Sequence, residues 1–260
     1  MNFGLTKHHA LIPVLRVKHY SNRLFSFAVA RPNRMKFKAG EFVMIGLIIN
    51  KKPTFRAYSI CTPSWSSELE FYSIKVPEGA LTTFLQKITR RNSILVKMKP
   101  TGTLVLRALI PGERLYLLCT GTGVAPFVSI LFEPEVYEKF KQVIIVLTCR
   151  QVIELQYLKD KLSELTRIKT LKTLARGKAR FYAATTREKS QFMGRIPHLI
   201  TSGKLTSALG GRPLNEKDRF MICGSQPMIN DVSTMLTKMG YKEGSTAKPK
   251  HFVFEKAFAD

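Results

Sequence analysis

The chain has 260 residues, of which 45% are hydrophobic, so it is long enough to bury two modest cores and two domains are expected. Its formal net charge of +24 is compatible with three kinds of anionic partner: a nucleic acid, a membrane surface or an acidic protein. The four cysteines are widely spaced and form no C-x-x-C pair, which excludes the usual zinc and iron–sulfur ligand patterns, so no metal is predicted. Reduced cysteines and the absence of any apolar run of about eighteen residues predict a cytoplasmic protein without a transmembrane segment.

The N-terminal segment contains no Asp or Glu in its first 40 residues, a composition that is also found in transit peptides. However, Phe25, Phe27 and Val29 alternate with small residues, which is the period of a strand and not of an amphipathic presequence helix. We therefore favour a strand here. The positive charge is scattered along the chain and no nucleic-acid-binding motif accompanies it, so nucleic acid is not the expected partner.

The first part of the chain, residues 1–110, is predicted to be an antiparallel β-barrel, because short strands recur at regular spacing between turn residues. One helix, Ala80–Ile88, interrupts the strands, and Lys51–Pro53 is expected to be a turn. The predicted strands are Ile12–Val17, Leu24–Ala30, Glu41–Asn50, Ala57–Cys61, Glu68–Val76 and Ser93–Lys99.

The second part, residues 111–260, alternates strands with helices, which predicts an α/β domain with a parallel sheet covered on both faces. Such sheets bind ligands at the carboxyl ends of their strands, as nucleotide-binding domains do. The predicted strands are Leu115–Cys119, Val143–Thr148, Phe181–Ala184 and Arg219–Cys223, and the predicted helices are Pro126–Leu131, Ile153–Leu165, Ile196–Ile200 and Pro227–Met239.

The segment Arg56–Ser59 combines three useful groups on one extended stretch. Arg56 offers a clamp for a phosphate, Tyr58 a flat face for stacking, and Ser59 a small hydrogen-bonding group. Further on, residues 79–83 open a helix whose free amide groups favour a phosphate. The alternative is purely structural: Tyr58 is a core residue and Thr82 is a helix cap.

Two further motifs follow strands in the second part. The segment Gly121–Pro126 follows a strand and opens a helix, and its glycines allow close approach to a pyrophosphate, although Pro126 replaces the third glycine of the standard fingerprint. The next strand ends at Arg150, where an NAD site of the standard type would have Asp or Glu. An arginine there favours a 2′-phosphate, so NADP(H) is predicted over NAD(H).

In their order along the chain, Arg56–Ser59, Gly121–Pro126 and Cys223–Ser225 resemble the plant-type ferredoxin–NADP reductases, and most closely their bacterial branch of flavodoxin/ferredoxin–NADP reductases. The resemblance extends over essentially all 260 residues. It implies FAD on the barrel, NADP(H) on the parallel sheet, and an acidic ferredoxin or flavodoxin as the electron-transfer partner. A monomer is expected.

The same resemblance implies roles for individual residues. For FAD it implies Arg56, Ala57, Tyr58, Ser59, Ile74, Lys75, Val76, Gly79, Leu81, Thr82, Thr122, Ala257 and Phe258. For NADP it implies Gly121, Thr122, Gly123, Arg150, Arg187, Arg195, Gly224 and Ser225. Cys223 and Ala257 are expected near the hydride-transfer site, and no residue is assigned as acid or base, because the flavin carries the chemistry.

The C-terminal run from Phe254 to Asp260 is similar to the tail that folds back over the flavin in the bacterial branch. In that arrangement Ala257 covers the flavin ring and Phe258 stacks on the adenine. The alternative is an edge strand, Phe252–Phe254, with a loose end.

Two other functions remain open at this point. The same module could serve another acceptor, such as an oxygenase or a quinone, although the chain lacks a fused C-x₄-C-x₂-C ferredoxin domain. Alternatively, a basic protein that binds nucleic acid or a membrane could have kept the fold. Retention of Arg56, Tyr58 and the nucleotide arginines argues against the second possibility.

Overall fold

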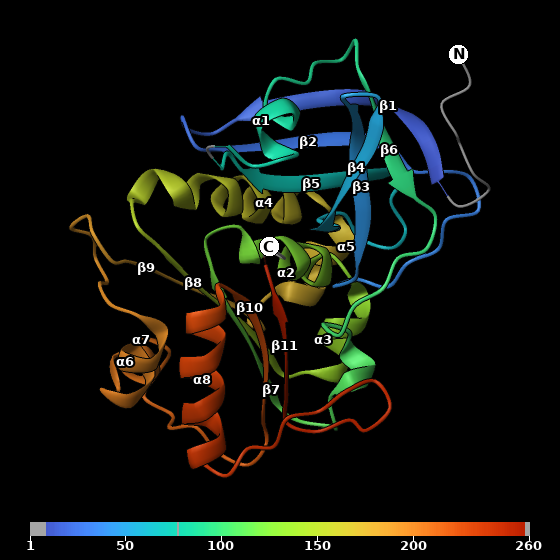
Figure 1. The fold of residues 1–260 in the computed structure, drawn as a ribbon. Coiled ribbons are helices and arrows are strands. Elements are labelled where there is room, and N and C mark those ends of the chain that lie inside the picture. Colours follow the sequence, from blue (N-terminus) through green and yellow to red (C-terminus); the bar gives the residue numbers. More distant parts are fainter. Residues whose placement is uncertain (1–8, 77, 258–260) are drawn as a thin grey trace.

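The computed structural model describes residues 9–76 and 78–257. Its first unit is an antiparallel sheet in the strand order β4-β3-β6-β1-β2-β5. The sheet curls so that β3 and β4 cross over β1, β2 and β5, forming a barrel whose edge strands are β4 and β5 (Figure 1). Its elements are β1 (His9–His19), β2 (Leu24–Ala30), β3 (Phe42–Ile49), β4 (Lys52–Ser59), β5 (Glu68–Ile74), α1 (Thr82–Leu85), β6 (Ser93–Lys97) and the 3₁₀ turn η1 (Leu106–Ala108).

The core of the barrel confirms the strand prediction for Leu24–Ala30. The rings of Phe25 and Phe27 are 5.9 Å apart, the Phe27 and Phe71 rings are 5.4 Å apart, and all three side chains are at most 1% exposed. Burial of such large rings contributes about 1.5–3 kcal/mol per side chain. The alternation at residues 25–29 therefore encodes a buried strand.

The β3–β4 hairpin corrects the predicted turn at Lys51–Pro53. The two turn residues are Asn50 and Lys51, with φ angles of +49° and +62°, and β4 already begins at Lys52. Two consecutive positive φ angles are typical of the two-residue turns that match the twist of a hairpin. Pro53 is tolerated within β4 because this strand is an edge of the sheet.

The second unit is a five-stranded parallel sheet in the order β11-β10-β7-β8-β9, and it confirms the predicted α/β architecture. Its strands are β7 (Arg114–Thr120), β8 (Gln142–Cys149), β9 (Ala179–Thr185), β10 (Asp218–Gly224) and β11 (Phe252–Lys256). Its helical segments are η2 (Gly121–Val124), α2 (Ala125–Leu131), α3 (Pro134–Lys139), η3 (Val152–Leu155), α4 (Gln156–Arg167), α5 (Lys169–Ala175), α6 (Ile196–Thr201), α7 (Lys204–Ala208) and α8 (Gln226–Lys238).

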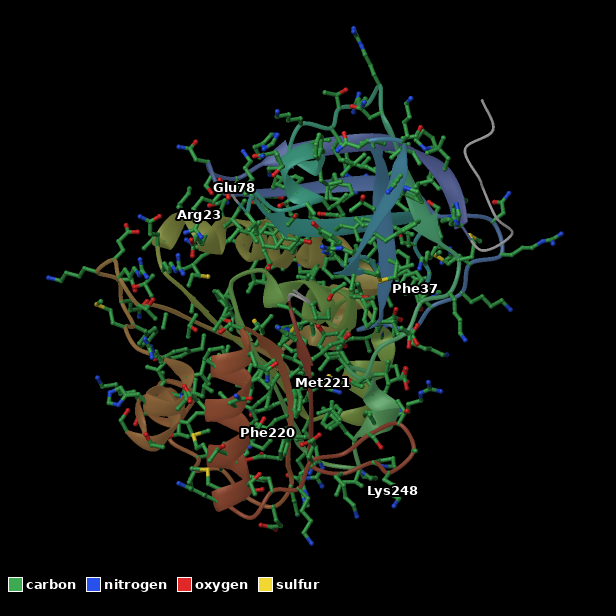
Figure 2. All side chains as sticks on the ribbon, in the orientation of Figure 1. Arg23, Phe37, Glu78, Phe220, Met221 and Lys248 are labelled. Atoms are coloured by element: carbon green, nitrogen blue, oxygen red, sulfur yellow. The ribbon has the colours of Figure 1, made fainter. Side chains whose placement is uncertain are left out.

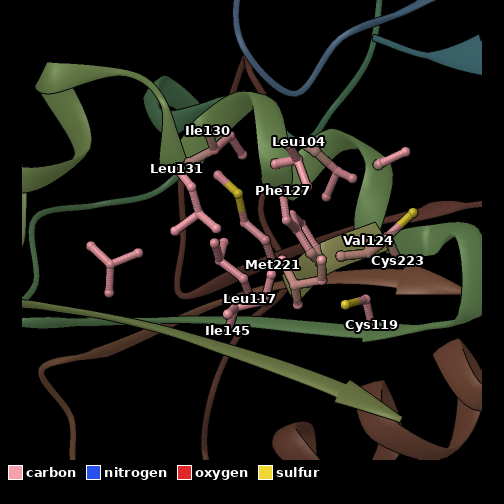
Figure 3. Close-up of a cluster of buried hydrophobic side chains, with 14 of the residues drawn as sticks. Leu104, Leu117, Cys119, Val124, Phe127, Ile130, Leu131, Ile145, Met221 and Cys223 are labelled. Carbon is pink, nitrogen blue, oxygen red and sulfur yellow. The ribbon is translucent and has the colours of Figure 1, made fainter. Parts of the chain in front are cut away.

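Successive residues of the central strands enter two different cores. On β7, Leu117 and Cys119 join the cluster that α2 to α5 cover, whereas Leu118 joins the cluster beneath α6 to α8. Figure 3 shows the first cluster, in which Leu117, Ile145 and Met221 of three neighbouring strands lie below Phe127 of α2. The strands are apolar without interruption because both of their faces are buried.

Several helices differ from the predictions. The predicted helix Ala80–Ile88 forms a single α-helical turn, α1, because Lys87 and Ile88 donate to residues three positions earlier and not four. The helices α3, α5 and α7 have five to seven residues and were not predicted. Helices of this length show no clear hydrophobic period, and these three each follow another helix and not a strand, so strand–helix alternation does not reveal them either. Gly240 ends α8 as predicted, with a φ angle of +90°.

The two units are joined on the side of β5 and α4. The rings of Tyr72 on β5 and Tyr157 on α4 stack with centroids 4.0 Å apart and planes 8° from parallel. Next to this stack, Lys161 Nζ lies 2.7 Å from a carboxylate oxygen of Glu70. These contacts place the carboxyl ends of the parallel strands against the barrel (Figure 1).

The cysteine side chains lie in the interior of the molecule. All four cysteines, Cys61, Cys119, Cys149 and Cys223, are free and buried. Within residues 9–76 and 78–257, no helix is both long and apolar enough to cross a bilayer.

Candidate functional site

A cavity of about 280 Å³, the barrel cavity, opens between the barrel and the end of the second unit. Most of its wall comes from β4, the end of β5 and the start of α1, and three residues come from the second unit. It is lined by Arg56, Ala57, Tyr58, Ser59, Tyr72, Ser73, Ile74, Val76, Gly79, Ala80, Leu81, Thr82, Thr122, Ala125 and Ala257. The predicted FAD residues Lys75 and Phe258 are not in this wall: Lys75 lies outside the lining, and Phe258 lies outside the described residues.

Tyr58 is both a core residue and a wall of the barrel cavity. Its ring packs edge-on against Phe27 and Phe71, with centroids 6.4 and 6.3 Å away, and its hydroxyl lies 3.0 Å from the Ser73 hydroxyl. Burial raises the pKa of the Tyr58 phenol, so the ring remains neutral. Tyr58 therefore adds an aromatic ring to the cavity wall, and such a ring is suited to a planar ligand.

Arg56 and Thr82 lie at polar positions of the same cavity. Arg56 is exposed, and its Nη1 donates to the Phe55 carbonyl at 2.9 Å, which leaves the other N–H groups of the guanidinium for an anion. The structural alternative required Thr82 to cap α1, and it does not. Its hydroxyl donates to the Val76 carbonyl at 3.2 Å, and Gly79 leaves the space for it, since a Cβ there would lie 2.3 Å from Thr82 Oγ1.

A second and larger cavity of about 690 Å³, the sheet cavity, lies at the carboxyl ends of β7, β8, β9 and β10. This is the edge of a parallel sheet where ligands bind. It is lined by Arg23, Leu24, Ile74, Thr120, Gly121, Thr122, Thr148, Cys149, Arg150, Glu154, Thr185, Thr186, Arg187, Met193, Gly194, Arg195, Ile196, Pro197, Ser225, Pro227, Met228 and Asp231.

The two predicted loop glycines have different roles. Gly121 has a φ angle of +53° and lines the sheet cavity, with nothing within 4 Å of an added Cβ. Gly123 lies outside the lining, and a Cβ there would be 2.3 Å from the Cys223 carbonyl oxygen. Gly224 is similar, because its Cβ would be 2.3 Å from Thr120 Oγ1. Gly121 therefore faces the ligand space, whereas Gly123 and Gly224 allow the loop and strand ends to pack closely.

The three predicted arginines lie around the sheet cavity. Arg150 follows β8, Arg187 follows β9 and Arg195 precedes α6, and all three are exposed. The lining holds only two carboxylates, Glu154 and Asp231. Three arginines among the lining residues make the wall of this cavity electropositive, as a phosphate ligand would require.

The barrel cavity and the sheet cavity meet. Thr122 and Ile74 line both, so a ring bound against Tyr58 and a nucleotide bound along β7 and β8 approach each other there. Cys223 lines neither cavity and is 1% exposed, and burial raises the pKa of its thiol, so it is not a nucleophile. The Ala257 amide donates to the Gly224 carbonyl at 2.9 Å, which brings the end of β11 to the barrel cavity.

Comparison with known proteins connects both cavities to a family. The sequence matches the Oxidoreductase FAD-binding domain over residues 14–105 and the Oxidoreductase NAD-binding domain over residues 117–234. It is 49% identical over 247 residues to a flavodoxin/ferredoxin–NADP reductase from Rhodobacter capsulatus, covering 94% of this chain and 92% of that protein. The chain belongs to the ferredoxin/flavodoxin–NADP reductase family.

Other members of the family extend the agreement. A ferredoxin–NADP reductase from Pseudomonas aeruginosa is 42% identical over 249 residues, covering 95% of this chain and 96% of that protein. A crystal structure of a ferredoxin NADP⁺ reductase from Neisseria gonorrhoeae with bound FAD and NADP superposes with a TM-score of 0.88 at 30% identity, covering 97% of this chain and all of that one.

Some lining residues of this ferredoxin/flavodoxin–NADP reductase family member were not predicted. In the barrel cavity they are Tyr72, Ser73, Ala80 and Ala125, all of which adjoin predicted residues or motifs. In the sheet cavity the most distant is Arg23, which belongs to the turn between β1 and β2 and lies at the left of the barrel in Figure 2. No local pattern distinguishes Arg23 from the other basic residues of the first unit.

Glu255 is a titratable group beside the barrel cavity of this family member. It lies two residues before Ala257 on β11, and the Thr103 amide donates to its carboxylate at 3.3 Å. Burial raises the pKa of Glu255 to about 7. The folded protein therefore binds this proton more tightly than the unfolded chain does.

The pKa of Glu255 predicts a pH-dependent stability. The stabilisation from its protonated form is complete below the ordinary glutamate pKa and is lost as the pH rises through about 7. We expect the Tm to fall by a few degrees across this range, and Glu255→Gln to remove that part of the pH dependence. Thermal unfolding between pH 5 and 8 measures both, with the exposed Glu138→Gln as the control. A parallel pH profile for Glu255→Gln and wild type would contradict the assignment.

Proposed function

We propose that this protein is an FAD-dependent oxidoreductase that exchanges electrons between NADP(H) and a ferredoxin or flavodoxin. The observation that carries the proposal is the junction of the two cavities at Thr122 and Ile74, one with an aromatic wall and the other with an arginine rim. Membership of the family, and the FAD and NADP bound by the Neisseria gonorrhoeae relative, support the same conclusion.

The barrel, residues 1–110, holds FAD in this proposal. The residues around the barrel cavity fit this cofactor: Tyr58 offers a fixed ring face, Arg56 offers free guanidinium donors, and Ser59 and Ala257 line the same space. FAD supplies hydride acceptance from NADPH and single-electron transfer to the protein partner. The protein itself aligns the two cofactors and contributes no acid or base.

The α/β unit, residues 111–260, holds NADP(H) along the sheet cavity. Gly121 leaves space for the pyrophosphate, and Ser225 lies at the end of β10. Arg150, Arg187 and Arg195 receive the 2′-phosphate. Charge-assisted hydrogen bonds contribute about 1.5–3 kcal/mol each, so even two of them make NADP(H) strongly preferred over NAD(H).

The protein partner is an acidic ferredoxin or flavodoxin. The net charge of +24 attracts an acidic carrier and speeds encounter in a manner that salt weakens. The curated relatives are named for these carriers, which supports them over an oxygenase or a quinone as the acceptor. In this proposal the protein acts as a monomer in the cytoplasm.

An anaerobic visible spectrum before and after addition of a nucleotide tests this function. We expect a yellow protein whose flavin band bleaches with stoichiometric NADPH and much more slowly with NADH. The bleached protein should then reduce an added flavodoxin, at a rate that falls as the salt concentration rises. A protein that remains colourless after incubation with FAD would refute the proposal.

A further inference from the structure

The loops that carry Arg150 and Arg187 are joined by an unusual arrangement of two glutamates. The first loop follows β8 and the second follows β9, and they lie side by side because β8 and β9 are neighbouring parallel strands. Both backbone polar groups of Arg150 are bonded to this arrangement. Its amide donates to Glu154 Oε2 at 2.9 Å, and its carbonyl accepts from the amides of Arg187 and Glu188 at 3.1 and 3.2 Å.

The side chain of Glu188 completes a reciprocal bridge between the loops. Glu188 donates its own amide to the Arg150 carbonyl, and its carboxylate accepts the Val152 amide at 2.8 Å. The loop after β8 is thus bonded to Glu188 at two points, one on each side of Gln151. The hydroxyl of Thr186, which donates to the Cys149 carbonyl at 3.2 Å, supports the same junction.

The charge of these two residues is unexpected at this site. The chain has 18 acidic residues against 42 basic ones, yet two of the acidic residues lie beside a rim that is proposed to bind a phosphate dianion. A free carboxylate there would repel the phosphate. Each carboxylate instead accepts a hydrogen bond from a backbone amide, Glu154 from Arg150 and Glu188 from Val152. The negative charge is thereby bonded to the loop, and the bonds fix the backbone that carries Arg150.

We propose that Glu154 and Glu188 are positioning residues that hold Arg150 and Arg187 at one spacing, and that they thereby set the preference for NADP(H) over NAD(H). This inference rests on the proposed role of the arginines in binding the 2′-phosphate. Neither glutamate touches the reacting atoms. Each acts through an arginine, because a flexible loop must lose conformational entropy before two guanidinium groups can grip one phosphate, and the bridge removes that cost in advance.

The decisive variant is Glu188→Ala in the FAD-loaded protein. We expect the KM for NADPH to rise about tenfold, because one charge-assisted hydrogen bond that orders the loops is lost. The KM for NADH should change by less than about twofold, since NADH has no 2′-phosphate. Binding of 2′-AMP should weaken as much as that of NADPH, whereas 5′-AMP should be unaffected. A rise in KM for both nucleotides would overturn the proposal in favour of a general structural role.

Glu188→Gln separates positioning from charge. The glutamine oxygen still accepts the Val152 amide, and its NH₂ group can face solvent because position 188 is exposed. Positioning therefore predicts that Glu188→Gln binds NADPH as well as wild type or better, since a negative charge near the phosphate is removed. Binding as weak as in Glu188→Ala would overturn the proposal. Glu138→Ala, an exposed helix position that lines neither cavity, is the matched control.

A double-mutant cycle tests whether Glu188 acts through the arginines. In an Arg150→Ala/Arg187→Ala background, Glu188→Ala should weaken NADPH binding by less than about twofold further, because nothing remains to be positioned. A full additional tenfold loss there would overturn the proposal. The cycle also distinguishes the role of the arginines in phosphate binding from the positioning role of Glu188. If the arginine variant weakens NADPH and NADH equally, the phosphate assignment itself fails; if it affects only NADPH while Glu188→Ala affects neither, only the positioning role fails.

Discussion

We expect the double variant Arg150→Ala/Arg195→Ala to bind NADPH on the order of 100-fold more weakly than wild type, while NADH binding changes by less than about threefold. Both side chains line the sheet cavity from different elements, one after β8 and one before α6. Two charge-assisted hydrogen bonds of about 1.5–3 kcal/mol each account for a loss of this size. Because the 2′-phosphate is the only difference between the nucleotides, the ratio of the two affinities isolates this contact.

The measurement is the dissociation constant of the oxidised nucleotides, NADP⁺ and NAD⁺, which do not reduce the flavin, for the FAD-loaded protein by difference absorbance at two salt concentrations. The control is Arg167→Ala/Arg176→Ala, which also removes two exposed positive charges but from positions outside both cavities. The control should retain the NADPH preference. Equal weakening of NADPH and NADH in the Arg150/Arg195 variant would mean that these side chains bind a part that the two nucleotides share.

The second large effect concerns FAD. We expect Arg56→Ala/Tyr58→Ala to bind FAD on the order of 100-fold or more weakly, and to be purified largely colourless. The guanidinium contact with a phosphate contributes about 1.5–3 kcal/mol. Stacking of a ring on an aromatic side chain contributes about 1–3 kcal/mol. FAD content per polypeptide and the affinity of the apoprotein for added FAD measure the loss.

Two controls separate ligand binding from folding in this experiment. Tyr58→Phe keeps the ring and loses only the hydroxyl that lies 3.0 Å from Ser73 Oγ, so it should retain most of the FAD affinity. Lys52→Ala removes a positive charge from the same strand without touching the barrel cavity and should remain yellow. If Arg56→Ala/Tyr58→Ala folds and keeps a full complement of FAD, the barrel cavity is not the flavin site.

The strands of both units could be predicted where neighbouring residues form a recognisable pattern. Alternation of large and small residues marked Leu24–Ala30, and apolar runs marked four of the five strands of the parallel sheet, β7 to β10. It also placed Arg56, Gly121 and Arg150 at strand positions where ligands bind, and the structure puts all three on cavity walls. These features repeat at a fixed spacing or adjoin a strand end, so neighbouring residues are enough to reveal them.

The short helices and the hairpin register were beyond local patterns. The helices α3, α5 and α7 exist because they cover apolar faces of a sheet whose strands are distant in sequence, and not because of a period of their own. Likewise β4 begins at Lys52 although its second residue is Pro53. Proline has no N–H group to donate, and a strand at the edge of a sheet tolerates this because it has a partner strand on one side only.

The candidate site shows the same division. Patterns along the chain indicated the two units, the nucleotide loop and Arg150 at a strand end, whereas Arg187 and Arg195 were indicated by the family resemblance. Only the tertiary structure decided that Arg23 of the barrel lines the nucleotide space, that Glu255 accepts the amide of Thr103, and that Glu188 accepts the amide of Val152. The partners in these contacts lie between 36 and 152 residues apart where a hydrogen bond joins them. Burial and charge at such positions depend on which strand ends meet, and that is a property of the folded sheet and not of any local stretch of chain.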